Sequence, residues 1–68
     1  MKAMAPTEVI RCTRLLKRGC RLQLELKGPW QPNGNCVFVR RTRRGILIDC
    51  LGRKREIPWG EVVHIAML

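Results

Sequence analysis

The side chains with chemistry to offer are mainly cationic. The 68 residues include 14 Lys and Arg against 5 Asp and Glu, which gives a net charge of +9 with His neutral. Twelve of the cations fall into three clusters: Arg11, Arg14, Lys17, Arg18, Arg21; Arg40, Arg41, Arg43, Arg44; and Arg53, Lys54, Arg55. A field this positive attracts polyanions, of which nucleic acid is the commonest. An acidic protein or an anionic lipid surface would answer the same field, and a merely solvated surface is the remaining interpretation.

The second and third clusters are the candidate binding residues. Positions 40 to 44 carry four arginines, and the whole chain has only five acids to pair with its cations. These arginines are therefore expected to project into solvent or onto a ligand. A phosphate-binding surface would use the residues Arg40, Arg41, Arg43, Arg44, Arg53, Lys54 and Arg55. Trp30, in a loop beside them, either stacks on a base or folds back as a lid over a small core.

The remaining inventory predicts no catalysis and no metal site. Cys12, Cys20, Cys36 and Cys50 form no C-x-x-C pair, and the single His64 has no neighbouring ligand, so zinc is not expected. Each cysteine falls in an expected helix or strand, where a reduced thiol acts as a small apolar side chain. Two disulfides are the alternative if the protein is exported. There is no Ser/His/acid set and no Gly-rich phosphate loop. We expect a non-enzyme without a cofactor.

Neither a signal peptide nor a membrane-spanning run is visible, which favours the cytoplasm. Residues 1–6 are expected to be a loose lead-in, followed by a short amphipathic helix over 7–18. Thr7 is its expected N-cap and Gly19 its C′ residue. Apolar residues at positions 9, 12, 15 and 16 have helical spacing. The opposite, basic face is either solvated surface or a binding face. A helix that lies on a membrane surface would carry bulky aromatic residues on its apolar face, and this helix has none.

Five strands follow, expected over 20–27, 35–42, 45–51, 54–57 and 62–68. Leu22, Leu24 and Leu26 alternate with polar residues, which predicts one buried face. Both faces of 35–42 are apolar, so that strand is either central or bent between two halves of a barrel. Turns are expected at Asn33-Gly34 and at Gly52-Arg53. A compact kink is expected over 58–61, for which one turn of 3₁₀ helix is a candidate, and Trp59 is expected to plug one end of the barrel.

These elements predict one mainly β domain over 1–68: a small five-stranded SH3-like or Sm-like barrel preceded by the helix. In a strongly bent barrel the hairpin tips could join the two arginine clusters into one basic surface. Such a thin core leaves Val37, Leu47 and Leu51 in need of cover, which a homo-oligomer would provide.

The segments CRLQLELKG (20–28) and RRGILIDCLGRKREIPWGEVVHIAML (43–68) resemble the Rof family, the modulators of Rho-dependent transcription termination, and are similar in organisation to Sm-like proteins. The resemblance rests on residues 22–27, Gly52, residues 55–57, Val63 and Ile65. It implies an Sm-like barrel and a bacterial regulator of RNA processes. Rof proteins present an acidic face to Rho, whereas this chain is strongly basic, so the fold carries over better than the partner does. No individual binding residue is transferred.

Two functions follow from these observations. The first is a non-catalytic regulatory module that binds nucleic acid, RNA rather than DNA. The second is a Rof-like adaptor that docks an acidic partner or a transcription-termination factor through a strand edge or its basic rim.

Overall fold

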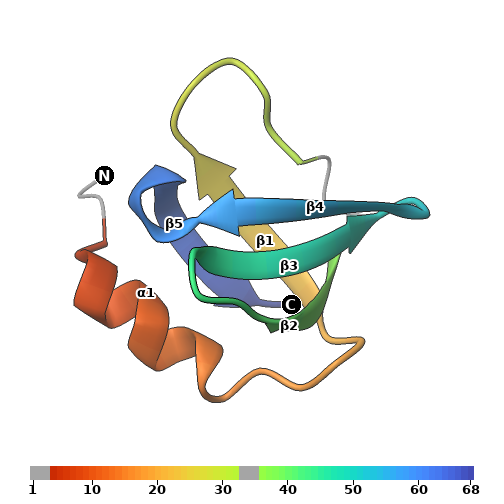
Figure 1. Cartoon of the computed structure of the whole chain (residues 1–68), viewed down its shortest axis with the longest axis horizontal. Helices are drawn as coiled ribbons and strands as arrows, with labels where there is room; N and C mark the ends of the chain where they lie inside the picture. The colour runs from red at the N-terminus through yellow and green to blue at the C-terminus, as the bar shows by residue number, and fades with distance from the viewer. Residues whose placement is uncertain (1–3, 33–35) are drawn as a thin grey trace.

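A computed structural model describes residues 4–32 and 36–68. Five strands form one open antiparallel sheet in the order β4-β3-β2-β1-β5, with one short helix at the N-terminal end (Figure 1). The elements are α1 (Pro6–Thr13), β1 (Arg21–Leu26), β2 (Cys36–Arg41), β3 (Gly45–Cys50), β4 (Arg53–Pro58), the 3₁₀ turn η1 (Trp59–Glu61) and β5 (Val62–Met67). The mainly β prediction and the order of elements are confirmed. The expected Asn33-Gly34 turn, Asn35 and residues 1–3 lie outside the described residues.

The helix α1 is shorter than predicted and begins earlier. Its N-cap is Ala5 and not Thr7, its first residue is Pro6, and the Glu8 carboxylate accepts a hydrogen bond from the Ala5 N–H at 3.2 Å. Proline suits this position because its missing N–H would have no partner there. The helix ends at Thr13, whose side chain is buried and whose hydroxyl donates to the Ile10 carbonyl at 2.7 Å. Gly19 therefore lies beyond the helix end and is not its C′ residue.

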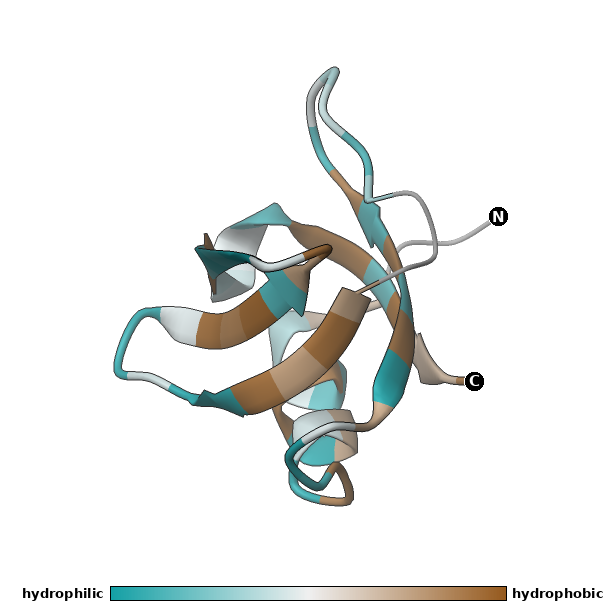
Figure 2. Ribbon diagram, turned by 90° about the vertical axis from the view of Figure 1, so that its right-hand side faces the viewer, coloured by the Kyte–Doolittle hydropathy of each residue, from teal (hydrophilic) through white to brown (hydrophobic). Residues whose placement is uncertain are grey.

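The core lies on the inner face of the bent sheet, and α1 packs against β5 and η1 and adds Val9 to it. The alternation of β1 holds: Leu22, Leu24 and Leu26 are buried while their neighbours are exposed. The buried cluster is continuous and consists of Val9, Leu22, Leu24, Leu26, Cys36, Phe38, Ile46, Ile48, Ile57, Val62 and Ile65. Figure 2 shows that the brown, apolar segments lie mainly on the strands, where they are interrupted by teal, hydrophilic ones.

The strand β2 is central and also marks a change in the sheet. It pairs with β3 from Cys36 to Arg41, whereas its ladder with β1, within the described residues, comprises Arg21 opposite Val37 and Leu22 opposite Cys36. The register with β3 shifts between Phe38 and Arg40, which is typical of a β-bulge. The sheet therefore bends here and is open, so the expected SH3-like or Sm-like barrel is not confirmed.

The β3–β4 turn differs by one residue from the prediction. The strand β3 ends at Cys50 and β4 begins at Arg53, so the turn residues are Leu51 and Gly52 and not Gly52 and Arg53. Both have positive φ, 56° for Leu51 and 85° for Gly52, as a type I′ turn requires. The Asp49 carboxylate accepts a hydrogen bond from the Gly52 N–H at 2.8 Å and fixes the turn. Leucine is unusual in this conformation and is 76% exposed.

The kink after β4 is a 3₁₀ turn, as expected. Trp59, its first residue, is half-buried and packs against the core cluster. Gly45, at the start of β3, is buried where β3 meets β4. A Cβ atom there would lie 2.8 Å from the Cα of Pro58 and closer still to the Ile57 backbone. Glycine is therefore required where these two strands approach each other closely.

The prediction of four reduced thiols is wrong for two of them. Cys36 and Cys50, directly opposite each other on β2 and β3, form a disulfide, and Cys12 and Cys20 are free. The sequence spacing could not indicate this, because the pairing depends on the register of two neighbouring strands. Among the described residues, no helix is long and apolar enough to cross a membrane.

Candidate nucleic-acid interface

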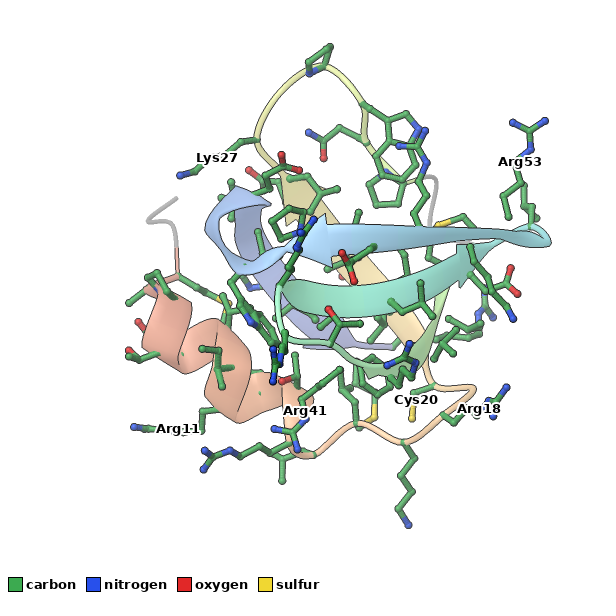
Figure 3. All side chains as sticks on the ribbon, viewed as in Figure 1. Arg11, Arg18, Cys20, Lys27, Arg41 and Arg53 are labelled. Carbon is green, nitrogen blue, oxygen red and sulfur yellow. A yellow bond between two sulfur atoms is a disulfide. The ribbon has the colours of Figure 1, made fainter. Side chains whose placement is uncertain are left out.

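The predicted phosphate-binding residues are exposed, but they form two groups. The end cluster consists of Arg40 and Arg41 at the end of β2 and Arg43 and Arg44 in the turn that follows. The tip cluster consists of Arg53, Lys54 and Arg55 at the start of β4. The tips of consecutive hairpins lie at opposite ends of their shared strand, here β3. The expected merging of the two clusters at one rim is therefore wrong, and Figure 3 shows Arg53 at the β3–β4 tip with Arg41 well away from it.

The end cluster is carried by a tightly bonded turn. The Thr42 N–H donates to the Gly45 carbonyl at 2.8 Å, and the Gly45 N–H donates to the Thr42 hydroxyl oxygen at 3.0 Å. The carbonyl of Arg44 accepts a further bond from the Trp59 N–H at 2.9 Å. The backbone of Arg43 and Arg44 is thus held at both sides, which leaves their side chains free to meet a ligand.

The tip cluster places charge on the inner face of the sheet. Arg53 lies opposite Cys50, and Arg55 lies opposite Ile48, which is fully buried. Residues directly opposite in an antiparallel pair share a face, so both arginines are on the side of the core. Burying unpaired guanidinium groups would be costly, and this is a physical reason for the sheet to stay open here. Lys54 lies opposite Asp49, on the outer face.

Trp30 belongs to this tip and not to the core. Trp30 is 37% exposed, and the guanidinium carbon of Arg55 lies 4.1 Å from the centroid of its ring. This distance is that of a cation–π contact. The lid over the apolar core is therefore the wrong alternative for Trp30. One face of the indole is already occupied by Arg55, so the ring and the guanidinium act as one surface.

Gln31 is a site residue that sequence reasoning missed. Its side-chain oxygen accepts a hydrogen bond from the Leu26 N–H at 2.9 Å, and its amide nitrogen donates to the carbonyls of Leu26 and Gly28. These bonds close the loop after β1 and hold Trp30 over Arg55. The only signal in the sequence was a polar residue between a tryptophan and a proline, which is not specific.

A concave groove of about 190 Å³ lies beside the Trp30–Arg55 contact. It combines apolar walls with the two inward-facing arginines. We call it the tip groove, and its lining residues are Trp30, Gln31, Pro32, Cys36, Cys50, Leu51, Arg53 and Arg55. The disulfide contributes both of its cysteines to this lining.

A second surface lies on the other side of the molecule, where α1 meets the edge strand β5. An apolar hollow of about 150 Å³, the β5 groove, is lined by Cys12, Leu15, Leu16, Ile65, Ala66 and Met67. Leu15 is 79% exposed. The five cations of the first cluster are exposed, and Arg11, Arg14 and Lys17 are sequence neighbours of the groove residues Cys12, Leu15 and Leu16. Figure 3 shows Arg11 and Arg18 pointing outward. Within the described residues no group of three metal-binding side chains occurs.

Comparison of the chain with protein-family models, with curated proteins and with solved structures found no match.

Proposed function

We propose that the protein is a non-catalytic module that binds nucleic acid, RNA in preference to DNA. The observation that supports this best is the arrangement of exposed cations around β4. The tip cluster starts this edge strand, and the end cluster lies beside its far end, where Gly45 pairs with Pro58. Six residues of strand span about 17 Å, enough for one backbone to meet both clusters. Glu56 is the one acid on β4 between them.

A salt titration tests the proposal. Affinity should be measured by fluorescence anisotropy for single-stranded RNA, single-stranded DNA and duplex DNA at several salt concentrations. Each neutralised phosphate contributes about 0.7 to the slope of log affinity against log salt for a single strand. Changing Arg40, Arg41, Arg43 and Arg44 to Gln should therefore lower the slope by about 3. Absent or salt-insensitive binding would overturn the proposal.

The control variant changes four cations of the α1 region, Arg11, Arg14, Lys17 and Arg18, to Gln. It removes the same net charge from α1 and the segment that follows it, which form no strand pair with β4. The affinity of this control for nucleic acid should fall only because the net positive charge is lower. Its slope of log affinity against log salt should change less than that of the variant at positions 40, 41, 43 and 44. An equal change in both variants would contradict the assignment to β4.

The proposal also covers the type of barrel, the cellular role and the location of the protein. The order β4-β3-β2-β1-β5, with the two edge strands joined by η1, supports an Sm-like or SH3-like barrel that closes on a ligand or a second copy. We also propose the role of a bacterial, Rof-like regulator that acts in the cytoplasm. Thiol trapping in intact cells checks the location, since a persistent Cys36–Cys50 disulfide there would argue against a reducing compartment.

The β5 groove favours a second candidate, an adaptor for an acidic protein. It is an apolar hollow beside an edge strand, and such an edge accepts an extended peptide as a further strand. The exposed cations next to its helix-side residues in the sequence, Arg11, Arg14 and Lys17, would select an acidic segment by charge complementarity. Pulldown after nuclease treatment should then retain a partner, and Leu15→Asp should release it. Loss of all partners on nuclease treatment would exclude the adaptor and leave nucleic-acid binding as the single candidate function.

A further inference from the structure

The tip groove has the properties of a site for one planar, partly apolar ring. Its volume of about 190 Å³ is below the range of about 300–1,000 Å³ that drug-sized ligands occupy. Its walls include an indole, a proline, a disulfide and a leucine side chain. Two guanidinium groups stand among these apolar walls, so the groove favours a ring with hydrogen-bond acceptors on its edge.

The position of the groove links it to the phosphate-binding cations. Arg53 and Arg55 line it, while Lys54 between them faces the opposite side of β4. A backbone that passes along β4 would thus have its phosphates on the exposed cations and one base directed toward the groove. Unstacked bases bind aromatic side chains and Arg guanidinium planes in this way.

Base-paired nucleic acid cannot use such a site. In a duplex each base is stacked between neighbours and bonded to its partner, so entry into a pocket requires that it be flipped out. A single strand, a loop or a bulge presents its bases without that cost.

We propose that the tip groove binds one unpaired nucleobase, held against the Trp30–Arg55 surface and facing Leu51 and the Cys36–Cys50 disulfide. The ligand class is therefore single-stranded nucleic acid, in which β4 binds the backbone and the groove takes a base. This inference rests on the proposed function, and the experiment below distinguishes the failure of one from the failure of the other.

The test compares two oligonucleotides of equal length, one with bases and one fully abasic, which carry the same number of phosphates. Stacking of one base is worth about 1–3 kcal/mol, which corresponds to roughly 5- to 150-fold in affinity. The abasic strand should bind that much more weakly with the same salt slope. Equal affinity would overturn the base site and leave the proposed function standing. Absence of binding by both would overturn both.

Fluorescence locates the effect. The chain has two tryptophans, so Trp59→Phe leaves Trp30 as the sole indole. Its emission should change when the strand with bases binds and stay constant with the abasic strand. A change of equal size with both strands would contradict base contact.

Two variants complete the test. Trp30→Leu should abolish the preference for the strand with bases while affinity for the abasic strand stays within about twofold. Leu51→Asn removes a wall of the groove at an exposed turn that accepts asparagine, so the variant keeps the fold. It should reduce the same preference. Full preference in both folded variants would overturn the proposal.

Discussion

Arg55 lies over the ring of Trp30, with 4.1 Å between the guanidinium carbon and the ring centroid. The contact joins the edge strand β4 to the loop that follows β1, two segments that share no strand pairing. In the sequence these residues are 25 positions apart, and neither predicts the other. The tip groove therefore forms only when folding brings these two segments together.

Removal of the guanidinium should release the indole. We expect Arg55→Leu, in a Trp59→Phe background, to increase the quenching of Trp30 by acrylamide and to lower stability by about 0.5–1 kcal/mol, the value of an exposed cation–π contact. Lys54→Leu is the matched control, because Lys54 faces the other side of β4. Similar quenching in the two variants would mean that Arg55 does not shield the ring.

Gly45→Ala should be strongly destabilising. The added methyl group would collide with the Ile57 and Pro58 backbone of the neighbouring strand, and strands cannot separate without losing ladder bonds. We expect a loss of at least about 3 kcal/mol in urea unfolding. Gly60→Ala is the control, because a Cβ there meets nothing within 4 Å. A change below about 1 kcal/mol for Gly45→Ala would contradict the close crossing of β3 and β4.

Leu51 is a site where a substitution should stabilise the protein. Its φ of 56° is costly for leucine, while its exposure of 76% means that little burial is lost on replacement. Leu51→Asn should raise stability by about 1 kcal/mol, because asparagine tolerates the left-handed region. Leu51→Val should lower it, since β-branched residues tolerate positive φ least. The reverse order in thermal unfolding would exclude a type I′ turn.

The sequence predicted the elements well and their three-dimensional relationships less well. Strand bounds agreed closely because alternation, as at Leu22, Leu24 and Leu26, is a local signal that records one buried face. The helix end was misplaced because the chain after Thr13 continues in tighter turns, in which the Leu16 N–H donates to the Thr13 carbonyl three residues back. Apolar spacing does not distinguish such turns from a further turn of α-helix. The hairpin turn was misplaced because Leu51 adopts a conformation that its residue type disfavours.

The candidate site was predictable only as a set of cations. Composition alone indicated that the arginines must be exposed, but the division into two clusters follows from the antiparallel order of β2, β3 and β4. The disulfide and the tip groove depend on the register of the strands. Cys50 of β3 lies opposite Cys36 of β2 on one side and opposite Arg53 of β4 on the other. Register depends on contacts between residues far apart in the sequence, so the residue types of one strand do not predict it.

The disulfide predicts a specific thiol count. Denatured protein without reductant should react with two equivalents of a thiol reagent, from Cys12 and Cys20, and with four after reduction. Because the cross-link closes a loop between residues 14 positions apart, its removal in a Cys36→Ala/Cys50→Ala variant should cost about 3 kcal/mol. Cys12→Ala/Cys20→Ala serves as the control, because it also removes two cysteines but keeps the cross-link. Four reactive thiols before reduction would contradict the pairing.

Gln31 should be the residue that orders the loop after β1. Gln31→Ala removes three hydrogen bonds to backbone groups and should cost about 1–3 kcal/mol, since a partly buried backbone donor and acceptor lose their partners. Gln31→Glu keeps the acceptor for the Leu26 N–H and loses the donors, so its cost should be comparable. Hydrogen exchange at the Leu26 amide provides the measurement: faster exchange in Gln31→Ala than in Gln31→Glu is expected, and equal rates would contradict the assigned bonds.

The charges of β4 have a consequence for handling the protein. An edge strand offers unpaired backbone groups to any other chain, and lysine or arginine along it discourages such pairing. Arg53, Lys54 and Arg55 would bring like charges together if two copies met through β4. Replacing all three with apolar residues would thus remove a safeguard against fibril-like association. Glutamine variants, studied at low concentration, keep a loss of ligand binding separate from a gain of self-association.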